Sequence, residues 1–296
     1  MSDQAEKLRQ LAESENKGRT DAAKEPAHHA VTIAIVSGKG GTGKSCFSVN
    51  FSISLALAGK RVLVLDADFG LSNLDVMYGT KPEFNLSHVL RGEKTLSEVV
   101  CRGYGGVFYI AGGAGAKELL SINKRQMRTI LKQAIHMDEA YDYVIFDCGA
   151  GVNPQVLYIT SFCDEALIVM TPEPTAVTDA FVLVKSIQGL KTPPPIRFVM
   201  NRVDSLIEAV TVAHTFKNVV SKYLACELGY LGYVSYDKNM VKSIKAQAPI
   251  AISNANSKAS KDIRDLAMNY ANITKRSFRG GLHQYIDKVL RKNEQQ

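Results

Sequence analysis

Eight consecutive residues have the composition and spacing of a phosphate-binding loop. They read Gly-Lys-Gly-Gly-Thr-Gly-Lys-Ser, ending at Lys44 and Ser45, and fit the pattern G-x-x-x-x-G-K-[ST]. The glycines let backbone N–H groups converge on phosphate oxygens. The lysine can reach the β- and γ-phosphates, and the serine hydroxyl can ligate Mg²⁺. We therefore expect a bound nucleotide to be contacted by Gly38, Lys39, Gly40, Gly41, Thr42, Gly43, Lys44, Ser45 and Cys46.

The segments on either side of this loop support that expectation. The apolar run Val31–Val36 predicts a buried strand before the loop, and Phe47–Ala58 predicts a helix after it. The N-terminus of such a helix adds partial positive charge where phosphates would bind. The loop also contains a second lysine, Lys39, which an ordinary loop of this class does not require.

Three carboxylates follow two other predicted strands. Asp147 ends the apolar run from Tyr143 and is followed by a glycine-containing loop, whereas Asp66 and Asp68 end the run that begins at Arg61. A strand-end aspartate near a bound Mg²⁺ can hold the metal, and the glycines after it give a loop able to respond to the γ-phosphate. From residue chemistry alone, each aspartate could instead cap a turn.

Four motifs, in order, resemble those of the MinD/ParA family of ATPases. The segment from Lys39 to Ser45 resembles the deviant Walker A motif with its signature lysine. The segment from Asp66 to Asp75 resembles switch I, in its MinD form, and the segment from Asp147 to Gly151 resembles switch II. Asn201-Arg202 resembles the adenine-contacting pair, and the resemblance covers about residues 31–252.

The resemblance implies an enzyme that hydrolyses ATP with Mg²⁺ and acts as a homodimer. Lys39 and Lys44 would contact phosphates, with Lys39 reaching across the dimer, and Asp68 would orient or activate the hydrolytic water. The Mg²⁺ shell would involve Ser45, Asp66 and Asp147, and the adenine would meet Asn201 and Arg202.

Strand and helix patterns alternate through the body of the chain. Strands are predicted at Val31–Val36, Arg61–Asp66, Val107–Ile110, Tyr143–Asp147, Ala166–Thr171, Ile196–Asn201 and Leu231–Val234. Between and after them, helices are predicted at Lys124–Met137, Asn153–Phe162, Ala176–Leu190, Leu206–Glu227, Lys238–Ala248 and Ser257–Ile273. Near-continuous apolar strands with intervening helices indicate an α/β fold, with a mostly parallel twisted sheet covered by helices on both faces. We expect an N-terminal helix (1–12), a flexible linker (13–29), an ATPase domain (30–275) and a C-terminal helix (276–296).

Composition favours a cytoplasmic protein with reduced thiols. The 296-residue chain has a polar, charged N-terminus unlike a secretory signal, and no run approaches the roughly 20 apolar residues of a spanning helix. Its five cysteines are scattered, and Cys101 and Cys148 lack the arrangement we would want for an iron–sulfur site. We expect His28 and His29 to be a solvated linker pair, although they could bind a metal.

The N-terminal residues favour one branch of the family. The segment from Asp3 to Arg9 is similar to the D-Q-A-x-x-L-R segment of the FlhG branch, also called FleN or YlxH, which regulates flagellar number and placement. In that branch the segment stimulates the GTPase FlhF. By this resemblance Gln4 would have the key role, and the contacts would come from Asp3, Gln4, Ala5, Leu8 and Arg9.

The C-terminal residues predict an amphipathic helix that binds the inner face of the cell membrane. Its apolar stripe comprises Leu282, Tyr285, Ile286, Val289 and Leu290, with Phe278 preceding it. Basic residues accompany the stripe, as in helices that lie on anionic membranes. The alternative is a helix packed back on the body, and both states could occur in different nucleotide states.

Other functions of the same fold stay open. A MinD-type regulator of the division site would share the body and the C-terminal helix but would leave the Asp3–Arg9 segment unexplained. A ParA-type DNA-partition ATPase would need a basic surface on the dimer. The net charge of +7 lies mostly at the C-terminus, so we expect no specific nucleic acid partner. Flagellar switch or C-ring proteins are further candidate partners.

Overall fold

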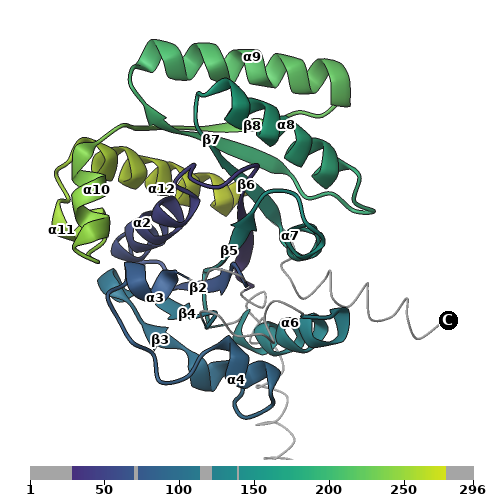
Figure 1. Ribbon diagram of the computed structural model, residues 1–296, viewed down its shortest axis with the longest axis vertical. Helices are drawn as coiled ribbons and strands as arrows, with labels where there is room; N and C mark the ends of the chain where they lie inside the picture. Colours follow the sequence, from purple (N-terminus) through teal and green to yellow (C-terminus); the bar gives the residue numbers. More distant parts are fainter. Residues whose placement is uncertain (1–28, 70–72, 114–121, 139, 278–296) are drawn as a thin grey trace, which may run out of the picture.

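The computed structural model describes residues 29–69, 73–113, 122–138 and 140–277. These residues form a sheet with the strand order β3-β4-β2-β5-β1-β6-β7-β8 (Figure 1). All neighbouring strands pair in parallel except β3 and β4, which are antiparallel. The strands are β1 (Val31–Ser37), β2 (Val62–Ala67), β3 (Cys101–Arg102), β4 (Phe108–Ile110), β5 (Tyr143–Ala150), β6 (Glu165–Met170), β7 (Ile196–Val203) and β8 (Gly229–Ser235).

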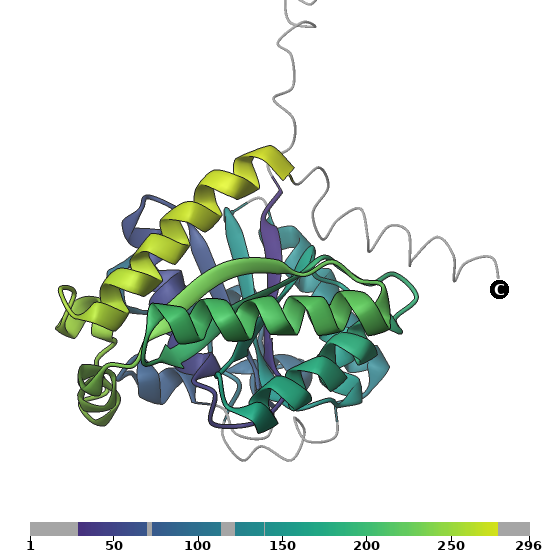
Figure 2. The same ribbon diagram turned by 90° about the horizontal axis from the view of Figure 1, so that it is seen from above.

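Helices cover both faces of this sheet. Figure 2 shows α12 on one side of β8 and α9 on the other. The α-helices are α2 (Lys44–Leu57), α3 (Leu74–Met77), α4 (Leu86–Leu90), α6 (Lys124–Asp138), α7 (Pro154–Thr160), α8 (Pro174–Gln188), α9 (Leu206–Leu224), α10 (Lys238–Lys245), α11 (Ile250–Ser253) and α12 (Lys258–Ser277). Two short 3₁₀ helices, η1 (Ser97–Val99) and η2 (Tyr104–Gly106), lie near β3. The predicted α/β architecture with a mostly parallel, doubly covered sheet is confirmed.

Strand alternation divides the apolar residues between two cores. In β1, Ala34 and Val36 face the core formed with α6 to α9, whereas Ile33 and Ile35 face the core formed with α2 and α12. All four side chains are fully buried. Because neighbouring residues of a strand point to opposite faces, a strand covered on both sides is apolar throughout, which is the pattern that the sequence shows.

The structure differs from the predicted elements in several bounds, and it adds the short helices α3, α4, η1 and η2, which were not predicted. Strand β3 was not predicted, because two residues at a sheet edge give no periodic signal. Helix α2 begins at Lys44 rather than Phe47, directly after Gly43. The predicted helix Lys238–Ala248 ends at Lys245, and Pro249 precedes the separate helix α11. The predicted N-terminal helix, nearly all of the linker and the C-terminal stripe lie outside the described residues, and their assignments stay predictions.

A buried carboxylate connects α12 to the sheet. Tyr270 of α12 donates a hydrogen bond of 2.9 Å to Glu165 Oε2 in β6, and Arg197 Nε of β7 lies 3.2 Å from Glu165 Oε1. Burial raises the pKa of Glu165 to about 7, and the Arg197 charge and the Tyr270 hydroxyl oppose this effect only in part. Helix α12, which shares a core with α2 on one face of the sheet, is therefore attached to the sheet through a titratable group.

Because of the Glu165 carboxylate, the free energy of unfolding should fall as pH rises from about 4.5 to 7. The pKa of Glu165 is raised from 4.5 in the folded chain, so the folded state holds the proton over a window in which the unfolded state releases it. The stabilisation is complete below that window and is lost through it, by at most about 3 kcal/mol. Glu165→Gln keeps an acceptor for Tyr270 and removes the titration. Urea unfolding at pH 5 and pH 7.5 should give a steeper loss for the wild type than for Glu165→Gln, and parallel losses would contradict the assignment.

Candidate nucleotide-binding site

The glycine-rich loop connects β1 to α2 and packs closely on α8. Gly41 and Gly43 have φ angles of 81° and 86°, in the left-handed region that favours glycine. Gly43 is the residue before α2, so the loop delivers its backbone to a helix N-terminus. A Cβ atom at Gly38 would lie 2.3 Å from the carbonyl carbon of Asp179 in α8. Position 38 therefore needs glycine for packing, whereas positions 41 and 43 need it for backbone conformation.

Lys44 lies in a buried cluster with Asp147 of β5. Its Nζ atom is 3.1 Å from Asp147 Oδ1 and 3.2 Å from Ser45 Oγ. The Lys44 and Asp147 side chains are 7% and 2% exposed. Burial by itself would lower the pKa of Lys44, but the Asp147 carboxylate outweighs burial and raises it. Ser48, one helical turn after Lys44, donates a 2.7 Å hydrogen bond to the same Asp147 oxygen.

Asp66 caps the loop that follows β2. It is paired in register with Asp147 across β2 and β5 and is 1% exposed. Its Oδ1 accepts a hydrogen bond from the backbone N–H of Asp68, and its Oδ2 accepts from those of Asn73 and Leu74. Both carboxylate oxygens thus hold the backbone. The capping alternative left open by the sequence is realised, and the role of Asp66 in a metal shell stays a prediction.

Asp68 lies beyond the end of β2, near Gly149 at the carboxyl end of β5. A Cβ atom at Gly149 would lie 3.6 Å from Asp68 Oδ1. The structure therefore gathers Lys44, Ser45, Asp66, Asp68 and Asp147 at one edge of the sheet, where the carboxyl ends of β1, β2 and β5 meet. Ligands bind at this edge of open α/β sheets. The catalytic assignment of Asp68 stays a prediction.

The residues present fit a nucleotide with Mg²⁺. The hydroxyl of Thr42 is buried in the loop and has no hydrogen-bond partner among the described residues, as expected of a group that binds a ligand. Within the described residues, no three His, Cys, Asp or Glu side chains are placed to hold a metal together. At nucleotide sites Mg²⁺ usually takes most of its ligands from phosphates and water.

Asn201 and Arg202, near the end of β7, donate hydrogen bonds to the backbone of the glycine-rich loop. Asn201 Nδ2 donates a 2.7 Å hydrogen bond to the carbonyl of Thr42, and Arg202 donates a 3.2 Å hydrogen bond to the carbonyl of Gly41. Arg202 adopts a φ of 60°, which is uncommon for a residue other than glycine. Both side chains thus contact loop carbonyls, and their contact with adenine stays a prediction.

A pocket of about 380 Å³ opens beside the loop. Gly41, Gly43, Asn201 and Arg202 form one wall. A second, largely apolar part of the wall comes from the end of β8, α10 and α12, with Val234, Met240, Val241, Ile244, Ala259 and Ile263, and the polar Ser235 and Asp237 also line the pocket. Pockets with apolar walls and few polar groups suit flat ligands such as a nucleobase. Sequence reasoning missed this wall; the signal that could have found it is the position of α10 directly after a strand's carboxyl end.

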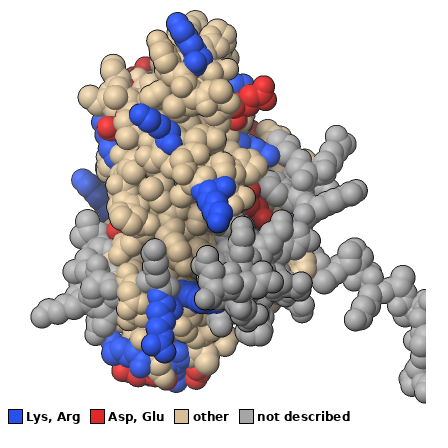
Figure 3. Space-filling model, turned by 90° about the vertical axis from the view of Figure 1, so that its right-hand side faces the viewer, with Lys and Arg blue, Asp and Glu red and all other residues tan. Residues whose placement is uncertain are grey.

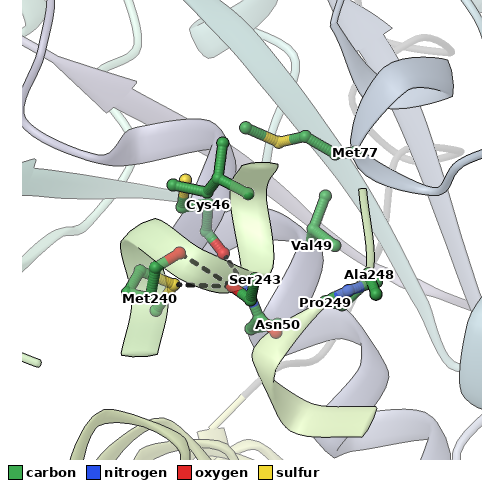
Figure 4. A pocket seen from close by; sticks show the side chains of 9 residues that line it. Cys46, Val49, Asn50, Met77, Met240, Ser243, Ala248 and Pro249 are labelled. Carbon is green, nitrogen blue, oxygen red and sulfur yellow. Dashed lines mark hydrogen bonds between the residues drawn. The ribbon is translucent and has the colours of Figure 1, made fainter. Parts of the chain in front are cut away.

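A second, much smaller cavity of about 20 Å³ adjoins this pocket and shares Cys46, Met240 and Ile244 with it. Figure 4 shows Cys46 of α2 and Met240 of α10 around this cavity, with Ser243 donating a hydrogen bond to the carbonyl of Met240. Burial raises the pKa of the Cys46 thiol to about 11. This thiol is therefore protonated at neutral pH and packs as a small apolar side chain.

The signature lysine contacts its own chain. Lys39 Nζ lies 3.1 Å from Glu173 Oε2 and donates a 2.8 Å hydrogen bond to Thr175 Oγ1, at the start of α8. The Lys39 and Glu173 side chains are 30% and 56% exposed. Of the two lysines of the loop, Lys44 is thus buried against a carboxylate, whereas Lys39 is half-buried and pairs with residues at the surface.

Comparison with known proteins identifies a family and several relatives of this chain. A family model described as an AAA domain matches residues 30–196. The antiactivator FleN of Pseudomonas aeruginosa is 30% identical over 240 residues, covering 81% of this chain and 86% of FleN. The flagellum site-determining protein YlxH of Helicobacter pylori is 36% identical over 203 residues, 68% of each chain. The septum site-determining protein MinD of Bacillus subtilis is 30% identical over 246 residues, 79% of this chain and 87% of MinD.

Solved structures show the same fold. MinD of Pyrococcus horikoshii complexed with Mg-ADP superposes with a TM-score of 0.71 at 23% identity, covering 83% of this chain and 97% of that one. On the strength of the family match, the relatives and the loop from Gly38 to Ser45, the chain belongs to the MinD/ParA family of P-loop ATPases, among the relatives that include FleN and YlxH.

Proposed function

We propose that this chain is an Mg-ATP-dependent, dimerising ATPase that acts as a switch controlling flagellar number or placement. The observation that carries the proposal is the pair of lysines in one loop. Lys44 is buried against Asp147, and Lys39 is half-buried at the surface beside Glu173. The similarity to FleN and YlxH over more than two thirds of the chain supports the flagellar role.

The residues of the site would divide the work of hydrolysis between them. The loop N–H groups and Lys44 would hold the phosphates, and Ser45 and Asp147, with Asp66, would complete the Mg²⁺ shell. When bound, Mg²⁺ neutralises charge that develops on the phosphate oxygens. Asp68 would orient the attacking water from the loop after β2. MinD of Pyrococcus horikoshii was solved with Mg-ADP, which supports this choice of nucleotide and metal.

Dimerisation would use Lys39. In the single chain its ammonium group binds Glu173 and Thr175, and exposed ion pairs of this kind contribute only about 0–1 kcal/mol. Exchange of Glu173 for the phosphates of a partner chain's nucleotide would therefore cost little. Two chains would then complete each other's sites, and hydrolysis would end the contact.

Asp68→Ala should stop hydrolysis without stopping dimerisation. The carboxylate of Asp68 lies outside the Lys44–Asp147 pair, so its loss leaves the phosphate contacts in place. We expect ATP hydrolysis to fall by at least about 100-fold, the lower end of the contribution of a positioned acid or base. Phosphate release measures the rate of hydrolysis, and light scattering measures whether the variant still dimerises with ATP. A variant that hydrolyses ATP at the wild-type rate would remove Asp68 from the mechanism.

The N-terminal residues would act on FlhF. Asp3, Gln4, Ala5, Leu8 and Arg9 lie outside the described residues, and the proposal rests on their similarity to the FlhG-type segment. A peptide of residues 1–12 should accelerate GTP hydrolysis by FlhF, and the same peptide with Gln4→Ala should not. Binding of the peptide to FlhF without acceleration would contradict the activating role.

The C-terminal residues would attach the dimer reversibly to the anionic inner face of the membrane. Within the part of the chain that the structure describes, no helix is both long and apolar enough to cross a membrane. One amphipathic helix binds membrane marginally, but the second helix of a dimer binds at high effective concentration. ATP should therefore increase binding to anionic vesicles, and equal binding in ADP and ATP would contradict this switch. Flagellar switch or C-ring proteins remain proposed partners.

The second candidate function is control of the division site, which the similarity to MinD of Bacillus subtilis favours. Binding of the N-terminal peptide to FlhF distinguishes the two. DNA partition is less well supported. On the parts of the face drawn in colour in Figure 3, Lys and Arg are scattered over a mostly uncharged upper part, and several gather beside acidic residues at the lower end.

A further inference from the structure

Ser48 has a buried hydroxyl that contacts Asp147, the candidate metal-binding aspartate. It lies in α2 one turn after Lys44 and is 0% exposed. Its Oγ atom is 2.7 Å from Asp147 Oδ1 and 3.0 Å from the carbonyl oxygen of Lys44. The same Asp147 oxygen lies 3.1 Å from Lys44 Nζ. One carboxylate oxygen is thus shared by a cation and a hydroxyl.

The hydroxyl of Ser48 has one proton and two acceptors. A carboxylate accepts a stronger hydrogen bond than a carbonyl does, because its charge assists the bond. The shorter of the two distances is the one to Asp147. The proton of Ser48 is therefore directed at Asp147, and the orientation of the carboxylate is set from the helix that begins with Lys44.

This arrangement differs from that of Ser54, a second buried serine of α2. Ser54 is also buried, and its hydroxyl donates to the carbonyl of Asn50 four residues earlier in the same helix. Bonding to a carbonyl of the preceding turn is the ordinary behaviour of a serine inside a helix. Ser48 has such a carbonyl within reach but lies closer to a side chain of β5, 99 residues away.

Nucleotide binding would change the surroundings of Asp147. Lys44 is the residue that the phosphates require, so its contact with Asp147 would weaken while the carboxylate stays buried beside Asp66. A buried carboxylate that loses a cation needs other partners. Lys44 and Ser48 both contact Asp147 Oδ1, and of these two Ser48 is the one that would not engage phosphate. A second contact that fixes a ligand's orientation is a common determinant of metal affinity.

We propose that Ser48 is a positioning residue that holds Asp147 for Mg²⁺ and so couples the metal to the bound nucleotide. This rests on the proposed function, because it presumes an Mg-nucleotide site at Lys44. Ser48 itself touches neither nucleotide nor metal. Its loss should weaken the response of the site to Mg²⁺ and leave the contacts to phosphate unchanged.

The test uses the full chain and a fluorescent ADP analogue titrated with Mg²⁺. Ser48→Ala should raise the Mg²⁺ concentration for half-maximal binding by about 10-fold or more. Its affinity for the analogue in EDTA should stay within about 2-fold of the wild type, a change too small to indicate a lost contact. Ser54→Ala is the matched control, since it removes a buried hydroxyl of the same helix, and it should change neither quantity. Ser48→Cys, which keeps the size and weakens the donor, should shift the Mg²⁺ response in the same direction.

The outcomes distinguish a failure of the proposed role of Ser48 from a failure of the proposed nucleotide site. An Mg²⁺ response of Ser48→Ala and Ser48→Cys equal to that of Ser54→Ala overturns the role of Ser48 and leaves the nucleotide site intact. A shift in EDTA affinity as large as the shift in Mg²⁺ response also overturns it, because Ser48 would then support the loop rather than the metal. Failure of the wild type to bind the analogue with Mg²⁺ contradicts the proposed function itself.

Discussion

Replacing Lys44 with alanine is expected to abolish nucleotide binding and to destabilise the fold by about 3 kcal/mol or more. The Lys44 and Asp147 side chains are 7% and 2% exposed, with 3.1 Å between Nζ and Oδ1. Removing the lysine leaves a buried carboxylate that keeps the Ser48 hydroxyl but has lost its cation. Urea unfolding of the nucleotide-free chain measures the stability, and titration with an ADP analogue measures the binding.

Lys39→Ala is the matched control, since it removes a lysine of the same loop. The partners of Lys39, Glu173 and Thr175, are at the surface, so its loss should change the free energy of unfolding by less than about 1 kcal/mol. The variant should bind nucleotide as a monomer and fail to dimerise with ATP. An equal loss of stability in the two variants would show that the Lys44–Asp147 pair does not hold the fold as described.

The second large effect is expected at Gly38. A Cβ atom there would lie 2.3 Å from the carbonyl carbon and 2.5 Å from the carbonyl oxygen of Asp179. Gly38→Ala must therefore separate the loop from α8, and overpacking of this kind costs about 1–3 kcal/mol or more. We expect a lower urea midpoint for unfolding. We also expect weaker nucleotide binding, because a shift of the phosphate-binding loop away from α8 would displace the backbone N–H groups that contact the phosphates.

Gly40→Ala is the comparison for this effect. A Cβ atom at Gly40 would meet nothing within 4 Å, and Gly40 is not among the residues with positive φ. Its stability should stay within about 1 kcal/mol of the wild type and could rise slightly, since alanine restricts the unfolded chain. A Gly40→Ala variant as unstable as Gly38→Ala would contradict the packing of the loop on α8.

The sequence predicted the fold well where the signal is local. The seven predicted strands all occur, because buried parallel strands are apolar runs bounded by turn residues. Glycine spacing was sufficient to place the loop between β1 and α2. Strand β3 and the start of α2 were missed, since the first has only two residues and the second begins with Lys44, a residue whose place in the helix depends on the loop before it.

The site was harder to predict because its contacts join distant residues. The partners of Lys39 lie 134 and 136 residues away, and Ser48 reaches Asp147 across 99 residues. Asp66 is a further example, since the same carboxylate after a strand fits a metal ligand or a cap, and the loop geometry gives it three backbone donors. The apolar wall from α10 and α12 depends on where two late helices pack, which no motif encodes.

The central claim is that ATP joins two chains through Lys39 while ADP leaves them apart. Light scattering coupled to size exclusion, with the Asp68→Ala variant and Mg²⁺, measures this directly because hydrolysis is slowed. The account predicts the mass of a dimer in ATP, the mass of a monomer in ADP, and a monomer in both nucleotides when Lys39→Ala is added. The same mass in ATP and ADP, or an ATP dimer that survives Lys39→Ala, would contradict it.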